Sequence, residues 1–238
     1  MLSTARTRAA ATVLTAACAL ALVAGCSDDE TDPSPDAGLI AVTTMRGAFL
    51  QAAEIGPAWD APQAADPQAS ADPVQMVNFC GGTTTPPQVP PGADVVSSSL
   101  ADEGSKGAQT LHQTALVYPD AATAANGQAL LKAVADKCAP SVSVPATVTA
   151  DRNEPAYTET VEVRPVDEAG WSGFVIIRHK RYEAAHPGTA DTAVAVLNSR
   201  NVVLVDTYAL YQLNNASASP NFENDWKRLV GTVVQRVG

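Results

Sequence analysis

The sequence predicts an α+β fold, in which an antiparallel sheet made of a hairpin plus a four-strand meander packs against about three helices. Four strand-like segments between residues 157 and 211 follow one another through short polar turns, which is typical of an antiparallel meander. An earlier pair of alternating segments is separated by a glycine-containing turn, which predicts a hairpin. Apolar residues recur at helical spacing before, between and after these two groups of strands.

The first 25 residues have the features of an export signal. Arg6 and Arg8 precede an apolar run from about Ala9 to Val23, which has the length of a signal-peptide core. A transmembrane helix needs about 18 or more apolar residues, and strongly polar residues follow this run at positions 27–30. We therefore expect residues 1–25 to be a signal peptide that is removed from the mature protein.

Small residues precede Cys26 in the sequence Leu22-Val23-Ala24-Gly25-Cys26. Val-Ala-Gly-Cys resembles the lipobox of bacterial lipoproteins, with valine where leucine is more usual. The resemblance implies cleavage before Cys26 and lipidation of its thiol by diacylglycerol, whose fatty acids include palmitate. Two chains hold a protein firmly on a membrane, because each buried CH₂ contributes about 0.8 kcal/mol. The alternative is an ordinary secreted protein that is cut near the same place.

The chain is acidic, with 15 basic and 25 acidic residues and a formal charge of −10. Removal of residues 1–25 takes away Arg6 and Arg8 but no acid, so the mature charge is −12. This argues against nucleic acid and anionic lipid as partners, because both bind basic surfaces. Residues 26–38 are mostly Asp, Ser, Thr and Pro, which indicates a flexible acidic tether ahead of one domain over residues 39–238.

The four cysteines predict one internal disulfide. Cys18 leaves with the signal and Cys26 carries the lipid, so Cys80 and Cys138 remain. Disulfides form and persist in exported proteins, and closing a loop of about 58 residues should contribute roughly 4 kcal/mol in the chain-entropy model. The alternatives are two free thiols or a bridge between two molecules.

The sequence of the first half of the domain predicts a helix, a long irregular segment and the hairpin. A helix over residues 44–54 follows from the spacing of its apolar residues, and Gly56-Pro57 ends it. Residues 61–93 are rich in Pro, Ala, Gly and Thr, and such a segment is either a functional lid or a plain connector. Strands are expected at Val95–Asp102 and Gln109–Tyr118.

The second half predicts two further helices and the meander. Asp120 is the expected N-cap of a helix that Pro140 closes, and the helix should bury Gly127, Leu130, Leu131, Val134 and Cys138. The meander comprises Tyr157–Arg164, Trp171–Glu183, Thr192–Leu197 and Val202–Tyr211, and its second strand is apolar on both faces near its centre. The last helix should start at Ser219-Pro220 and bury Phe222, Trp226, Leu229, Val230 and Val233.

This order of elements, together with the lipobox, is similar to that of an actinobacterial lipoprotein and resembles the PknH-like extracellular sensor domain family. The residues that carry the resemblance are Phe49 to Trp59, the Cys80 to Cys138 segment and Asn201 to Val205. The family implies an antiparallel sheet packed by helices over about residues 40–238, with a cleft for an unidentified ligand. No kinase segment is present, and no cysteine follows Cys138 to form the family's second disulfide.

No catalytic motif is recognisable. The sequence has no Gly-x-Ser-x-Gly nucleophile elbow, no phosphate-binding glycine loop and no His-Glu-x-x-His pair. His112, His179 and His186 are scattered, and no third metal ligand can be named for them. His112 on its strand is expected to be structural. We therefore expect no catalytic residue, no cofactor and no metal.

The densest basic segment in this acidic chain runs from Arg178 to Tyr182. On a strand Arg178, Lys180 and Tyr182 share one face, and Arg164 is a candidate to join them from the neighbouring strand. The functional interpretation is an anion-binding or carbohydrate-binding site. The structural interpretation is a solvated strand end whose basic side chains protect a sheet edge.

The resulting hypothesis is a lipid-anchored protein on the outer side of the cell membrane, whose domain binds or senses an unidentified small molecule, glycan or protein. One alternative is an envelope hydrolase, which predicts a pocket with a His or carboxylate in contact with a nucleophile. Another is an assembly lipoprotein with an exposed apolar patch for a protein partner.

Overall fold

The computed structural model describes residues 38–61, 76–102, 104, 107–149, 153–185, 188–213 and 219–238. Residues 38–238 form one compact unit. The export signal, Cys26 and the tether up to residue 37 lie outside the described residues, as does His186. The signal peptide and the lipid anchor therefore stay predictions.

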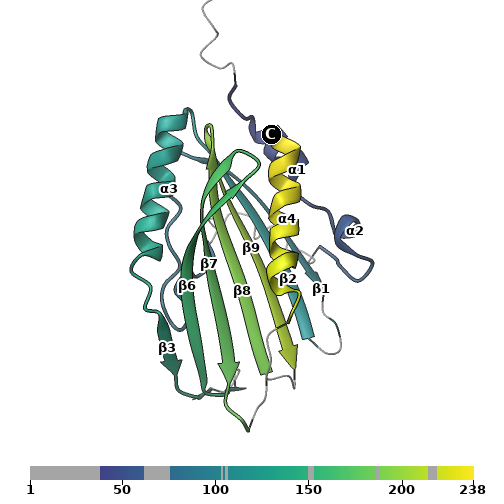
Figure 1. The fold of residues 1–238 in the computed structure, drawn as a ribbon, viewed down its shortest axis with the longest axis vertical. Helices are drawn as coiled ribbons and strands as arrows, with labels where there is room; N and C mark the ends of the chain where they lie inside the picture. The colour runs from purple at the N-terminus through teal and green to yellow at the C-terminus, as the bar shows by residue number, and fades with distance from the viewer. Residues whose placement is uncertain are drawn as a thin grey trace, which may run out of the picture. The chain divides into compact units, whose positions relative to one another are not determined.

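The domain is built on a seven-stranded antiparallel sheet with strand order β1-β2-β9-β8-β7-β6-β3, as Figure 1 shows. This confirms the α+β fold, with the hairpin and the meander joined through β2 and β9. The strands are β1 (Asp94–Asp102), β2 (Gly107–Val117), β3 (Ser141–Val144), β6 (Tyr157–Glu168), β7 (Trp171–Tyr182), β8 (Gly188–Ser199) and β9 (Val202–Leu213), while β4 (Thr147–Val148) and β5 (Asn153–Glu154) form a separate pair. The helices are α1 (Val42–Ala48), α2 (Ala52–Ile55), α3 (Ala121–Ala135) and α4 (Phe222–Val237).

The sheet is covered on both faces. Helices α1 and α4 run beside each other on one face, and α3 packs on the other (Figure 1). The alternation along β7 explains this arrangement, because Val175 and Ile177 enter the core under α4 whereas Phe174 and Ile176 enter the core under α3. The prediction that this strand is apolar on both faces is thereby confirmed.

The single helix predicted over residues 44–54 is wrong, because the chain forms two short helices there. Helix α1 ends where Phe49 takes an extended conformation, with φ −61° and ψ 140°. The N–H of the next residue, Leu50, donates to the side-chain oxygen of the buried Gln113 at 2.9 Å, and the Leu50 carbonyl accepts from the Gln113 amide nitrogen at 3.2 Å. In a continuous helix these backbone groups would bond to other backbone groups of the same helix. Their pairing with Gln113 instead separates α1 from α2.

Helix α3 buries a narrower face than predicted and ends earlier, at Ala135. Leu130 is 55% exposed, and the fully covered positions are Ala124, Gly127, Leu131 and Ala135. A Cβ atom on Gly127 would lie 2.2 Å from the Tyr118 hydroxyl, so the helix approaches the sheet through its small residues. That close approach turns Leu130 toward solvent.

Helix α4 begins two residues later than predicted, with Asn221 as its N-cap. The Ser219 hydroxyl instead accepts a hydrogen bond from the Asn221 N–H at 3.3 Å, ahead of the helix. The predicted buried stripe is confirmed and continues through Val234 and Val237. Among the described residues, no helix combines the length and apolar character required to cross a membrane.

Candidate ligand-binding cleft

The four residues predicted to bind a ligand are not all on one side of the sheet. Strand β7 places Arg178, Lys180 and Tyr182 on the face toward α3. Arg164 lies on the neighbouring strand β6 but projects to the opposite face, where its guanidinium pairs with Glu223 of α4 at 3.0 Å. Strand β7 lies between β6 and β8, so protection of a sheet edge is also a wrong explanation for these basic residues.

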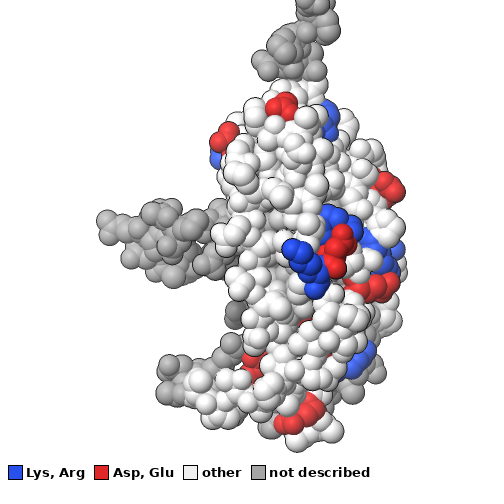
Figure 2. Space-filling model, turned by 90° about the vertical axis from the view of Figure 1, so that its left-hand side faces the viewer, with Lys and Arg blue, Asp and Glu red and all other residues white. Residues whose placement is uncertain are grey.

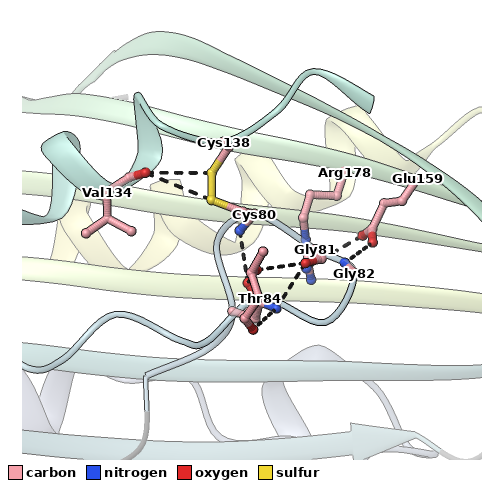
Figure 3. Close-up of a disulfide and its surroundings, with 9 residues drawn as sticks. Cys80, Gly81, Gly82, Thr84, Val134, Cys138, Glu159 and Arg178 are labelled. Carbon is pink, nitrogen blue, oxygen red and sulfur yellow. Dashed lines mark hydrogen bonds and ion pairs between the residues drawn. A yellow bond between two sulfur atoms is a disulfide. The ribbon is translucent and has the colours of Figure 1, made fainter. Parts of the chain in front are cut away.

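Arg178 forms part of a largely buried ion pair. Its guanidinium lies 3.6 Å from the Glu159 carboxylate, and the two side chains are 15% and 6% exposed. Burial lowers the pKa of Arg178, and the charge of Glu159 opposes that effect. The other carboxylate oxygen of Glu159 accepts the Gly82 N–H at 2.8 Å (Figure 3). The pair therefore fastens the irregular segment to the sheet.

Lys180 and Tyr182 belong to an aromatic cluster at the C-terminal end of β7. The Lys180 ammonium pairs with Glu154 and lies 3.6 Å from the ring centre of Tyr157 and 4.8 Å from that of Tyr182. Burial lowers the pKa of Lys180, but its hydrogen bonds to Glu154 and Tyr182 outweigh burial, so the pKa is raised. Tyr182 also contacts Tyr211 edge-on, with ring centres 6.1 Å apart.

The basic side chains therefore have acidic partners and do not form a positive patch. Figure 2 shows one side of the molecule, on which basic and acidic groups are intermixed and most of the surface is uncharged. Tyr157 and Tyr182 border an open groove of about 570 Å³. Ligand binding by Arg164, Arg178, Lys180 and Tyr182 stays a prediction.

The predicted disulfide between Cys80 and Cys138 is confirmed, with an S–S distance of 2.06 Å. It joins the irregular segment over residues 76–93 to the turn that follows α3 (Figure 3). Next to it, the Asn78 side chain accepts the Cys80 N–H at 3.0 Å and donates to the Thr84 carbonyl at 2.8 Å. The disulfide and these bonds together give the segment a fixed path over the sheet.

This fixed segment forms one wall of a cleft of about 280 Å³. Met76 and Val77 supply the wall, and β1, β2 and β9 supply the opposite side with Ser97, Ser98, Ser99, His112, Thr114, Val205 and Thr207. Within the described residues, no charged side chain lines this cleft. Its chemistry is therefore that of neutral hydroxyl groups and one imidazole, facing an apolar wall.

Strand register brings the polar groups of the cleft together. Ser99, His112 and Thr207 lie opposite one another on β1, β2 and β9, and Ser97, Thr114 and Val205 form the next row on the same face. The Ser99 hydroxyl lies 2.8 Å from Nδ1 of His112. Burial lowers the pKa of His112 below its ordinary value of 6.5.

Sequence reasoning missed this site, although it recognised both strands. It treated His112 as a structural histidine, because a histidine on a strand face is more often buried in the structure than a ligand. The useful signal was the alternation of polar residues at Ser97 and Ser99 on one strand and at His112 and Thr114 on the other. Only the register of the hairpin shows that these two polar faces coincide.

The other described histidine has a carboxylate partner. His179 Nδ1 lies 2.7 Å from Asp191, whose side chain is 1% exposed. In the part of the chain that the structure describes, no three His, Cys, Asp or Glu residues are grouped so as to hold a metal ion.

Comparison with known proteins gives one structural likeness. No family model matches the chain, and no curated protein matches it. The crystal structure of the extracellular domain of PknH from Mycobacterium tuberculosis resembles it with a TM-score of 0.49 and 17% sequence identity, over 84% of this chain and 97% of that chain. At this level the likeness is a weak resemblance between folds.

Proposed function

We propose that this protein is a lipid-anchored binding protein on the outer side of the cell membrane, and that the cleft between residues 76–77 and strands β1, β2 and β9 holds its ligand. The observation that carries the proposal is the convergence of neutral polar side chains in a cleft with one apolar wall. Binding sites commonly combine apolar lining with a few placed polar groups.

The lining favours a small, uncharged ligand. Hydroxyl groups of Ser97, Thr114 and Thr207 can donate or accept hydrogen bonds, whereas Met76 and Val77 favour an apolar edge. A charged ligand would lose its hydration without gaining an opposite charge from the described lining. A volume of about 280 Å³ accommodates a small molecule, or one unit of a larger glycan.

Two features support a location outside the cytoplasm. Residues 1–26 have the pattern of a lipoprotein signal, and Cys80 and Cys138 form a disulfide, which is typical of proteins in oxidising compartments. The acidic composition supports a partner other than nucleic acid.

Affinity measurements on matched threonine variants test the binding proposal. Native mass spectrometry of the full chain purified from its own host would identify a retained small molecule, and calorimetry would give its affinity for the wild type. Thr114→Val removes a hydroxyl from the cleft and should weaken binding about tenfold, which corresponds to one hydrogen bond. Thr110→Val, on the same face of β2 but outside the lining, should leave affinity unchanged. Equal affinities of both variants and wild type would contradict the proposal.

Membrane fractionation tests the anchor. Cys26→Ala removes the predicted lipidation site, and the protein should move from the membrane fraction to the soluble fraction. Cys18→Ala is the matched control, because Cys18 lies inside the predicted signal and should leave anchoring unchanged. Membrane retention of the Cys26→Ala protein would argue against a lipid anchor at this residue.

A further inference from the structure

We propose that Ser99 and His112 act as a nucleophile and its general base, and that the cleft accepts the acyl group of an uncharged ester. This inference rests on the proposed function, because the same cleft must hold the substrate. It departs from the expectation that the chain has no catalytic residue, and the reason is a contact that the sequence did not show.

The contact follows from the position of the two residues in the hairpin. Ser99 and His112 lie directly opposite each other on β1 and β2. The backbone N–H and carbonyl of Ala101 both form hydrogen bonds with Asp60, at 2.9 and 2.8 Å. These two backbone groups therefore point away from β2. Ser99, two residues earlier, has the same orientation and forms a non-hydrogen-bonded pair with His112. Side chains approach most closely at such pairs, and Ser99 Oγ lies 2.8 Å from His112 Nδ1.

The surroundings suit a nucleophile and a base. Ser99 is exposed, so its hydroxyl can be reached from the cleft, whereas His112 is half-buried. Burial lowers the pKa of His112, which keeps the imidazole neutral near pH 7 and able to accept a proton. A serine hydroxyl needs such an adjacent base before it attacks a carbonyl carbon.

The backbone of β1 offers a donor for the developing oxyanion. Strand β1 forms one edge of the sheet. The backbone N–H of Ser99 points away from β2, because Ser99 lies two residues before Ala101 and has the same backbone orientation. This N–H belongs to the same residue as the attacking hydroxyl. It can therefore donate a hydrogen bond to the negative oxygen of the tetrahedral intermediate that forms there.

The reaction balances without a cofactor. Ser99 Oγ bonds to the ester carbonyl carbon, and its proton passes to Nδ1 of His112. The carbon–oxygen bond to the alcohol then breaks, and the alcohol leaves with that proton. A water molecule attacks the acyl group on Ser99, gives a proton to His112 and releases the carboxylic acid. The bond between Ser99 Oγ and the acyl carbon breaks in this step, and the proton that His112 took from water passes to Oγ.

The test is covalent labelling of the full chain with a fluorophosphonate probe, read by intact mass and peptide mapping, together with hydrolysis of p-nitrophenyl butyrate. Label is expected on Ser99 and should disappear in Ser99→Ala. His112→Gln should slow labelling by about a hundredfold or more, the usual contribution of a general base. Thr110→Val is the matched control, because Thr110 lies on the same face of β2 as His112 but outside the cleft lining, and its labelling should match wild type.

Thr114→Val separates this inference from the proposed function. Weakened ligand binding in Thr114→Val without any label on Ser99 would overturn the catalytic inference and leave the binding function standing. Labelling of Ser99 together with a raised KM for the ester in Thr114→Val would support both. Equal labelling of wild type and Ser99→Ala would overturn the inference, provided that thermal unfolding shows both proteins to be folded.

Discussion

At the scale of single residues, the carboxyl of Asp206 is both buried and without a hydrogen-bond partner within the described residues. The residue is 1% exposed, and neither carboxyl oxygen accepts a hydrogen bond from the described residues. Its cross-strand neighbours are Gln113, whose amide is engaged by Leu50, and Ala195. Burial raises the pKa of Asp206 to about 8. The folded protein therefore holds a proton here at neutral pH that the unfolded chain releases.

Asp206 is expected to make the protein less stable as pH rises. Its folded pKa of about 8 lies above the ordinary 3.8, so the folded state binds more protons between these values and stability falls from pH 4 to pH 8. In Asp206→Asn this dependence should vanish, with a gain on the order of a few kcal/mol at pH 7. Urea unfolding of both proteins from pH 5 to 8 measures it, and the difference between the two curves removes the contribution of other groups. Parallel curves would contradict the prediction.

Asn201 joins three separate parts of the chain through one side chain. Its amide donates to the carbonyls of Tyr118 and Ile40 at 2.8 and 3.1 Å, and its oxygen accepts the Ile40 N–H at 2.7 Å. Asn201→Ala leaves these buried groups unpaired and should cost on the order of 3 kcal/mol. Asn198→Ala, which loses one half-buried bond to Val202, should cost about 1 kcal/mol. Denaturant unfolding measures the free energy of unfolding of both variants. Equal losses would contradict the prediction that Asn201 stabilises the domain more than Asn198 does.

At the scale of elements, the disulfide couples the stability of the domain to the shape of the cleft. Cys80 lies three residues after Val77, and the bond to Cys138 closes a loop with a sequence separation of 58. The Gly82 N–H bond to Glu159 holds the same segment a second time. Loss of the disulfide should therefore loosen the cleft wall without detaching the whole segment.

The double variant Cys80→Ser, Cys138→Ser is expected to lose about 4 kcal/mol of unfolding free energy, from the chain-entropy model for a loop of this length. Amide hydrogen exchange should accelerate at residues 76–82, whereas α4, on the opposite face of the sheet, should keep its protection at matched stability. Affinity for the cleft ligand should fall as well. Unchanged exchange at residues 76–82 would mean that the disulfide does not fix the cleft wall.

At the scale of the whole molecule, the sheet could be predicted because its signals are local. Alternation along each strand and polar turns between strands recovered the hairpin and the meander, and the apolar faces of β7 revealed two cores. The failures came from contacts between distant residues. Gln113 interrupts the first helix at Leu50, and Tyr118 against Gly127 turns Leu130 outward.

The candidate site was less predictable than the fold, for the same physical reason. Arg178 and Lys180 looked functional because a run of charge stands out in an acidic sequence, yet Glu159 and Glu154 neutralise them in space. No sequence motif marks Ser99 or His112, and only the register of the hairpin places them in contact. The disulfide could be predicted because the predicted export signal and lipid anchor account for Cys18 and Cys26, which leaves two cysteines to pair.

The start of the domain gives a prediction about the molecule as a whole. Residues 38–238 form a compact unit, and among the described residues Ile40 is the first that is buried, so a chain that begins at residue 38 should keep the stability of the full protein. A chain that begins at residue 51 loses α1 and five buried apolar side chains, those of Ile40, Met45, Ala48, Phe49 and Leu50.

The longer truncation should not fold. Each large buried apolar side chain contributes about 1.5–3 kcal/mol, and the net stability of a domain is about 5–15 kcal/mol. The deletion also leaves the Gln113 amide and the Asn201 side chain without their partners at Leu50 and Ile40. Urea unfolding followed by tryptophan fluorescence compares the two chains, since Trp171 and Trp226 are buried and remain in both. A cooperative transition in the chain that begins at residue 51 would show that α1 is an accessory to the sheet and not part of its core.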